Sequence, residues 1–289
     1  MRRIGVHTSI AGGIQKSLER AKELGCNTLQ IFSHNPRGWA VKEKTTEEVT
    51  NFKKLRNEFD ISPVFIHTSY LINLASQNKS LLKRSIDMIV QELNIADAIG
   101  AEYAVLHTGS ASGEDPGSAR KRAAKCLKEI SERGRWHARL LLENTAGEKG
   151  DITSKIRDIA EIMQEIPLTL VSGVCIDTCH AFSAGYDISN NEGIRSFAGE
   201  IDKYIGRDNV RLLHFNDSKG LTGAGLDRHE HIGEGKIGKP GLRKFLNHPF
   251  FADIPVILET PKKSEDDDIK NLTAVRKMIK NISSDIPVE

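Results

Sequence analysis

The chain of 289 residues has little that would mark a secreted or membrane protein. It has only four cysteines, Cys26, Cys126, Cys175 and Cys179, too few and too scattered to suggest a disulfide framework. No apolar run approaches the roughly 20 residues that cross a bilayer. The first residues, MRRIGVHTSIAGG, lack the apolar core of a signal peptide. We therefore expect a cytoplasmic protein that does not associate with membranes.

The sequence also lacks an excess of charge of one sign. Its 41 lysines and arginines are balanced by 39 aspartates and glutamates, which leaves a net charge of +2. A strongly basic chain would point to a polyanionic partner, so any nucleic-acid binding here must come from local placement of basic side chains. A hydrophobic fraction of 38% and a charged fraction of 28% are typical of a globular protein with a substantial core.

What the sequence does contain is a series of short aliphatic runs at fairly even intervals. The runs lie at residues 3–7, 28–32, 63–67, 102–107, 139–143, 174–177, 210–215 and 255–259. They do not alternate strictly, which is typical of parallel strands buried on both faces. Between them lie stretches with helical periodicity, at 14–24, 45–59, 80–100, 118–133, 153–165, 192–204, 240–247 and 266–281.

This alternation predicts the fold class. Eight strands that alternate with helices indicate an α/β protein with a parallel sheet, and eight is the number that closes a (β/α)8 TIM barrel. The rival architecture is an open, doubly wound sheet, but no G-x-G-x-x-G follows the first strand to support a nucleotide-binding version of it. Because no linker or low-complexity block divides the chain, we expect residues 1–289 to form a single TIM-barrel domain.

Six of the eight runs end, within one residue, in a histidine or a carboxylate. These residues are His67, His107, Glu143, Asp177, His214 and Glu259. In a closed barrel the carboxyl ends of all strands surround one mouth, so the six side chains would converge there. Any one of them alone is more simply a hydrogen-bonded structural residue or a helix cap. Carboxylates gathered without a cation would have raised pKa values, and a metal cluster removes that difficulty.

The glycine-rich segment HFNDSKGLTGAGLDRHEHIGEG, residues 214–235, leaves the seventh strand over the same mouth. Asp227 and His229 are two positions apart, so both can reach in from one side of an extended segment. His180, three residues after Asp177, can do so from the loop after the sixth strand. Five histidines and four carboxylates are too many for one tetrahedral zinc, and would supply three ions with three protein ligands each.

The types of ligand indicate the chemistry. Sites built from histidine and carboxylate, without thiolates, favour catalytic metal, and we assign Cys175 and Cys179 to the core. Two or three divalent ions a few ångströms apart activate water and stabilise a transferring phosphoryl group, so we expect phosphate-ester hydrolysis. Five basic residues fall in loops on the presumed metal face, where they would favour DNA phosphates: Arg37, Lys149, Lys219, Arg228 and Lys236.

Tyr70 and Leu71 lie immediately beyond His67, at the tip of a predicted loop. An aromatic and an aliphatic side chain in such a place can wedge between DNA bases. They can equally pack against the rim of the barrel. The residues alone leave both interpretations open.

Three longer segments resemble a known family. HTSYLIN, GVCIDTCHAFSAGYD and the glycine-rich segment are similar to the signature segments of endonuclease IV, the zinc-dependent apurinic/apyrimidinic endonucleases of the family-2 type. The similarity extends from GVHTSIAGG through NPRGW and LHTGS to VILETP, so it covers essentially the whole chain. It implies a (β/α)8 barrel with three zinc ions that cuts DNA on the 5′ side of an abasic site, leaving a 3′-hydroxyl and a 5′-deoxyribose phosphate.

The resemblance also implies individual roles. The first zinc would be held by His67 and His107, with Glu143 bridging to the second; the second would be completed by Asp177, His214 and Glu259; the third would be held by His180, Asp227 and His229. Glu143 would be the catalytic carboxylate, beside a metal-bridging hydroxide that attacks the phosphorus. Arg37, Tyr70 and Leu71 match residues with which the family penetrates DNA.

The same resemblance sets the expected substrate and partners. The substrate would be double-stranded DNA with an abasic site, whose sugar can flip out without breaking a base pair. Removal of 3′-blocking groups is a further expected activity. Manganese can accompany zinc at one or more sites, and we expect the protein to act as a monomer.

Two other functions compete with this one. A metal-dependent sugar isomerase or epimerase of the related barrels needs fewer metal ligands, so the additional group of His180, Asp227 and His229 argues against it. A DNA-lesion binder without catalysis would require the loss of a ligand. None of the nine positions is missing from the sequence.

Overall fold

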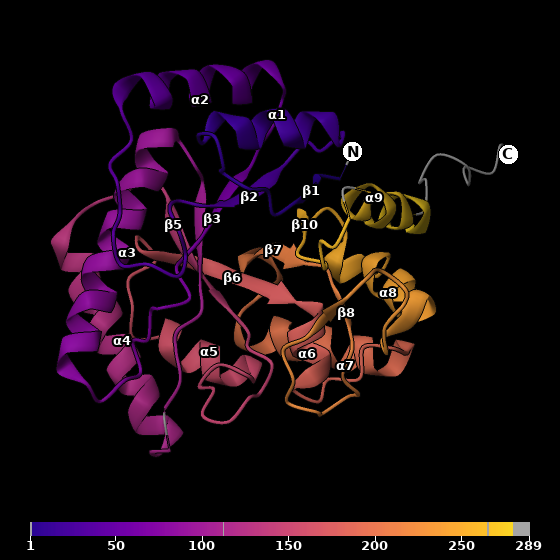
Figure 1. Cartoon of the computed structure of the whole chain (residues 1–289). Coiled ribbons are helices and arrows are strands. Elements are labelled where there is room, and N and C mark those ends of the chain that lie inside the picture. Colours follow the sequence, from indigo (N-terminus) through magenta and orange to yellow (C-terminus); the bar gives the residue numbers. More distant parts are fainter. Residues whose placement is uncertain (1, 112, 265, 280–289) are drawn as a thin grey trace, which may run out of the picture.

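A computed structural model describes residues 2–111, 113–264 and 266–279 of the chain. Its central feature is a cylinder of parallel strands with helices arranged around it (Figure 1). The strands are β1 (Ile4–Val6), β2 (Leu29–Phe32), β3 (Val64–His67), β4 (Tyr103–Leu106), β5 (Arg139–Glu143), β6 (Val171–Asp177), β7 (Val210–His214) and β10 (Val256–Leu258). They are hydrogen-bonded in the order β1-β10-β7-β6-β5-β4-β3-β2.

The cylinder closes where β1 meets β2. The backbone of His7 forms a parallel bridge with Gln30, and the Thr8 amide donates to the Gln30 carbonyl at 2.8 Å. At the other end of this pair, the Asn27 amide donates to the Ile4 carbonyl at 3.2 Å. A doubly wound sheet has two open edges, so this closure excludes it. The predicted TIM barrel is confirmed.

The helices follow the periodic stretches of the sequence. They are α1 (Gln15–Glu23), α2 (Thr46–Glu58), α3 (Lys79–Ile99), α4 (Pro116–Arg133), α5 (Ile156–Met163), α6 (Thr178–Ser183), α7 (Asn191–Tyr204), α8 (Gly238–Leu246) and α9 (Asp267–Met278), with short 3-10 turns η1 (Arg207–Asn209) and η2 (Pro249–Phe251). Helix α3 ends at Gly100 with φ of 74°, a left-handed conformation that glycine adopts without strain. None of the helices in the described part of the chain is long and apolar enough to cross a membrane.

One local expectation was wrong. The residues after Asp177 form helix α6 rather than a loop, because the Asp177 carboxylate accepts from the His180 amide at 2.8 Å and caps the helix at its first turn. The glycine-rich segment 214–235 contains the two-residue strands β8 (Asp217–Ser218) and β9 (His229–Glu230), which pair antiparallel. Helix α6 and this strand pair order the segments that carry His180 and His229.

The inside of the cylinder is filled by a small apolar cluster. Its members are Phe65, Val105, Leu141, Cys175, Leu212 and Ile257, all fully buried. A larger apolar core lies between the strands and the helices. Each member of the inner cluster is followed two positions later by one of the six predicted strand-end residues. Because side chains two apart share a face of a strand, those six also face inward, one layer nearer the mouth.

Candidate metal centre

All nine predicted ligand residues meet at the mouth formed by the carboxyl ends of the strands. Their donor atoms form three groups, in each of which the atoms lie within 4.8 Å of one another. The groups are His67, His107 and Glu143; Glu143, Asp177, His214 and Glu259; and His180, Asp227 and His229. These match the groupings that the family resemblance implied, with Glu143 shared by two of them.

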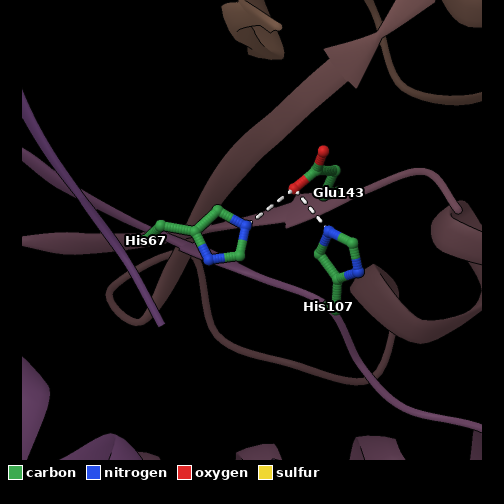
Figure 2. Close-up of side chains that lie close together, drawn as sticks. All are labelled: His67, His107 and Glu143. Atoms are coloured by element: carbon green, nitrogen blue, oxygen red, sulfur yellow. Dashed lines mark hydrogen bonds and ion pairs between the residues drawn. The ribbon is translucent and has the colours of Figure 1, made fainter. Parts of the chain in front are cut away.

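Glu143, the last residue of β5, occupies the middle of the first two groups. Its Oε2 lies 2.8 Å from His107 Nε2 and 3.5 Å from His67 Nε2, and Figure 2 shows the two rings approaching this one oxygen from different sides. Its other oxygen, Oε1, lies 2.8 Å from His214 Nδ1. Burial acts to raise the pKa of Glu143, but the charges of His214 and His107 lower it well below its usual value. The neighbouring histidines thus favour the ionised carboxylate although it is fully buried.

The second group has the same electrostatic character. His214 Nδ1 lies 3.1 Å from Glu259 Oε2 as well as close to Glu143. Burial alone would lower the pKa of His214, yet Cys175, Glu143 and Glu259 raise it well above its usual value. Burial would raise the pKa of Glu259, and His214 lowers it instead. The acids are thus stable together only with positive charge among them, which protons or metal ions can supply.

The third group provides the sharpest test of whether a metal fits. His180 Nδ1 lies 2.9 Å from the Asn144 carbonyl oxygen, and His229 Nδ1 lies 3.0 Å from that of Glu259. Because a carbonyl only accepts, each Nδ1 carries the hydrogen. Each Nε2 is buried and has no hydrogen-bond partner among the described residues. Both nevertheless lie near Asp227 Oδ1, at 3.2 and 3.5 Å. Two orphaned imidazole nitrogens and a carboxylate oxygen suit a common cation.

Two cysteine thiols lie close to these groups but do not carry the charge of their histidines and carboxylates. Cys175 Sγ lies within 4.8 Å of donor atoms of Glu143 and His214. Cys179 Sγ lies within 4.8 Å of donor atoms of Asp177 and His229. Burial raises the pKa of both thiols to about 12. Neutral, fully buried thiols behave as small apolar side chains, which agrees with their assignment to the core.

Above the groups lies an open pocket of about 900 Å³. Six of the nine residues line it: His67, His107, His180, Asp227, His229 and Glu259. Glu143, Asp177 and His214 are fully buried beneath them. A ligand in the pocket can therefore reach the first and third groups directly, and the second through Glu259.

Of the predicted DNA-contacting residues, Tyr70 lines this pocket, and Arg37 follows the lining residue Pro36 in the chain. Tyr70 is 62% exposed, and the edge of its ring packs on Phe32 with 5.2 Å between ring centroids. Leu71 is half-buried and Arg37 is exposed. The Ser69 hydroxyl donates to the Pro36 carbonyl at 2.8 Å, which joins the loop of Tyr70 to the loop of Arg37. The two loops that carry these three residues are therefore held together.

Two buried polar residues at the site were not predicted. Glu92 of α3 lies under the rim loops, where its Oε1 accepts from the Ser69 amide at 3.2 Å and from the Ser33 hydroxyl at 3.3 Å. Gln30 of β2 is fully buried and lies 2.8 Å from His214. The same sequence signal could have found both: each is a polar residue inside an otherwise apolar strand or helix face, where a buried polar group needs hydrogen-bond partners.

Asp217, by contrast, is a carboxylate of the glycine-rich segment that takes no part in the groups. Its two oxygens accept hydrogen bonds from backbone amides, including those of Gly233, Gly235 and Ile237. A Cβ on Gly235 would lie 2.4 Å from the Ser218 carbonyl oxygen, so only glycine permits this close turn. Asp217 therefore folds the segment that carries Asp227 and His229.

The sequence comparisons agree with this geometry. Residues 18–282 match the AP endonuclease 2 family, described as a xylose isomerase-like TIM barrel. A protein named probable endonuclease 4 from Persephonella marina is 41% identical over 97% of this chain and 98% of its own length. This chain belongs to the endonuclease IV family. A relative of the same name from Aquifex aeolicus is 38% identical over 96% of this chain and 98% of its own.

The structural comparisons separate family from fold. The crystal structure of endonuclease IV from Thermus thermophilus has 35% sequence identity and a TM-score of 0.84, covering 96% of this chain and 98% of that chain. A D-tagatose 3-epimerase-like protein has a TM-score of 0.72 but only 20% identity, with 96% of both chains covered. The second likeness shows the fold alone. The endonuclease IV family member described here is thus an endodeoxyribonuclease built on a barrel shared with sugar epimerases.

Proposed function

We propose that this protein is a DNA-repair enzyme that hydrolyses the phosphodiester on the 5′ side of an abasic site, leaving a 3′-hydroxyl and a 5′-deoxyribose phosphate. The observation that carries the proposal is the convergence of nine donor residues in three groups at one mouth of the barrel. Membership of the endonuclease IV family supports it. The proposed setting is the cytoplasm and the proposed form a monomer acting on double-stranded DNA.

The proposed metal is zinc, three ions in all, with manganese able to take one or more positions. Borderline-soft imidazole together with carboxylate is a ligand set that suits zinc. His67, His107 and Glu143 would hold the first ion, His180, Asp227 and His229 the third, and the four-membered group the second. When bound, divalent ions in neighbouring sites would activate water and stabilise the attacking and leaving oxygens of a phosphodiester.

Glu143 is the proposed catalytic residue because its two oxygens face different groups. One oxygen is directed at His67 and His107, and the other at His214. Glu143 would therefore contribute one oxygen to each of the first two groups if both held an ion. The apolar cluster directly below, which includes Leu141, keeps water away from the underside of the site. Charges in such a dry site interact more strongly than they would in water.

We further propose that Arg37, Tyr70 and Leu71 hold the DNA in a distorted form. The contact of Tyr70 with Phe32 fixes the ring while leaving most of its surface free to stack on a base. Arg37, exposed on the adjoining loop, can neutralise a phosphate. An abasic nucleotide has no base pair to break, so it is the nucleotide that costs least to turn out into the pocket.

The alternative of a sugar isomerase or epimerase has less support. The fold is shared with such enzymes, but that likeness extends to the barrel alone. A single ion bound by a few carboxylates and histidines would leave the orphaned nitrogens of His180 and His229 without a function. The exposed Tyr70 also lies at the rim, where it would suit an extended polymer better than a small sugar.

The proposal is tested with a 5′-labelled duplex that contains a single abasic site, alongside the same duplex without damage. We expect one incision 5′ to the abasic site with a 3′-hydroxyl end, loss of activity after treatment with chelator, and recovery with zinc. A duplex with a 3′-phosphate at a nick tests the removal of blocking groups. Incision on the 3′ side, or activity that survives complete chelation, would contradict the proposed mechanism.

A further inference from the structure

The histidines of the centre differ in which ring nitrogen they turn to the site. Three of them are held from behind by a backbone carbonyl that accepts from Nδ1, which leaves Nε2 facing the other donors. The Nδ1–oxygen distances are 2.8 Å for His67 to Thr68, 2.9 Å for His180 to Asn144 and 3.0 Å for His229 to Glu259. His214 is reversed: its Nδ1 faces Glu143 and Glu259, and its Nε2 points away from them, to the side chain of Gln30.

The contacts of Gln30 determine how its amide must be oriented. Its Nε2 donates to Glu259 Oε1 at 2.6 Å and lies 3.0 Å from His7 Nδ1, while its Oε1 lies 2.8 Å from His214 Nε2. The NH2 of the Gln30 amide therefore faces Glu259 as a donor, and an amide oxygen can only accept. The amide oxygen then faces His214, and His214 must carry a hydrogen on Nε2.

From this arrangement we propose that Gln30 is a positioning residue of the metal centre. It does for His214 what backbone carbonyls do for His67, His180 and His229: it accepts the Nε2 hydrogen and so directs the Nδ1 lone pair toward the second group. Through its NH2 it also fixes the Glu259 carboxylate, which belongs to the same group. Gln30 is not itself a ligand. The inference rests on the proposed metal centre.

Gln30 offers an experiment that the backbone carbonyls do not, because a side chain can be replaced. Gln30→Met keeps an unbranched, neutral side chain of similar length and removes both the acceptor and the donor. Gln91→Met, the same change at an exposed glutamine of α3, is the matched control. Chelated protein is titrated with Zn²⁺ in the presence of a competing chelator, and bound zinc is counted at each free concentration.

We expect Gln30→Met to weaken one of the zinc sites by about 10- to 100-fold while the others keep their affinity, as for other residues that orient a metal ligand. Gln91→Met should bind as the unchanged protein does. A merely structural role for Gln30 would lower the thermal midpoint of the metal-free protein and weaken all sites together. Unchanged affinity at every site in Gln30→Met would overturn the proposal.

A second measurement does not depend on the stability of the variant. In zinc-loaded protein with ¹⁵N-labelled histidine, long-range proton–nitrogen spectra report which ring nitrogen carries hydrogen. We expect His214 to be protonated at Nε2 and His67, His180 and His229 at Nδ1. His214 protonated at Nδ1 would overturn the proposal even if Gln30→Met fails to fold. Failure of the underlying function is distinct, since the unchanged protein would then hold no zinc at all.

Discussion

The two ends of the barrel use the same eight strands but arrange their charges differently. At the amino ends, two pairs of oppositely charged side chains lie apart from each other: Glu102, which precedes β4, lies 2.7 Å from Arg56, and Arg3, which precedes β1, lies 3.0 Å from Asp60. At the carboxyl ends, carboxylates and imidazoles converge on common points, and most of them are buried.

The difference shows which end can hold a catalyst. A pair of opposite charges satisfies itself and has nothing left for a ligand. A group of acids that share histidines keeps donor atoms directed at one another, and two of its nitrogens have no hydrogen-bond partner among the described residues. Residues at the amino end of a TIM barrel therefore contribute to stability, whereas those at the carboxyl end contribute to chemistry. One substitution made at both ends would separate these contributions.

The largest effect is expected from Glu143→Gln. The amide keeps the shape of the side chain but cannot supply two anionic oxygens to the neighbouring groups, so incision of an abasic duplex should fall to background. The fold should persist, because the residue packs in the same space. Incision rates and circular dichroism at the same protein concentration measure the two effects.

Glu102→Gln is the matched control for this change at the opposite end. It should incise the abasic duplex at the rate of the unchanged protein. The contrast between the two ends fails if Glu143→Gln remains fully active, or if Glu102→Gln is equally inactive while still folded.

A smaller effect is expected from Tyr70→Ala at the rim. Stacking of an aromatic side chain on a base contributes roughly 1–3 kcal/mol, so affinity for abasic duplex should fall by about fivefold to 150-fold. Fluorescence anisotropy with labelled duplex in chelator measures binding without cleavage. Leu168→Ala, which removes a side chain that is 70% exposed before β6, is the control and should bind normally. Equal affinities for all three proteins would show that Tyr70 merely packs the rim.

The buried carboxyl of Glu92, near the mouth, should make the free energy of unfolding depend on pH. Burial raises the pKa of its carboxyl to about 8, with the Ser69 amide opposing the shift. The carboxyl is then neutral in the folded state up to that pH but ionises in the unfolded chain above about 4.5. Its contribution to the free energy of unfolding is complete below that lower value and is lost as the pH rises to about 8.

Glu92→Gln is neutral in both states and removes this dependence. Urea unfolding of chelated protein from acid to alkaline pH should show the unchanged protein losing stability relative to the variant across that window. The neighbours of the carboxyl, Ser33, His34 and Ser69, are the same in both proteins. Two parallel stability curves would mean that the Glu92 carboxyl is ionised in the folded state.

The smallest effect is expected on the free energy of unfolding of Glu102→Gln. Loss of its ion pair with Arg56 removes an interaction between partly exposed side chains, worth about 0.2–1 kcal/mol. Unfolding in urea should detect this loss, while the incision rate stays constant. A loss of several kcal/mol would mean that the amino end depends on its ion pairs more than their exposure suggests.

The barrel and the positions of the donors could be predicted from the sequence because both follow from local patterns. Aliphatic runs separated by amphipathic stretches specify strands and helices, and closure of the barrel places every strand end at one mouth. His67 and Glu143 could therefore be assigned to one site although they lie far apart in the chain. The structure places His107 and Glu259 one residue beyond their strands, which is within the stated margin.

Gln30 and Glu92 could not be assigned in the same way. Gln30 lies two positions before Phe32, the last residue of β2, and it reaches the centre only because its side chain is long. Glu92 acts on loops that tertiary packing brings to it. Helix α6 was missed because Asp177 has two functions, as a strand-end donor and as a helix cap. Because the position of Asp177 at a strand end was already explained by its role as a donor, the pattern provided no reason to look for a second role as a helix cap.

Metal analysis of the purified protein tests the central claim most directly. If the three groups are metal sites, the protein as isolated should contain about three transition-metal ions per chain, mostly zinc. Chelation should remove them and abolish incision, and zinc should restore both. Fully active protein that contains no transition metal would contradict the account.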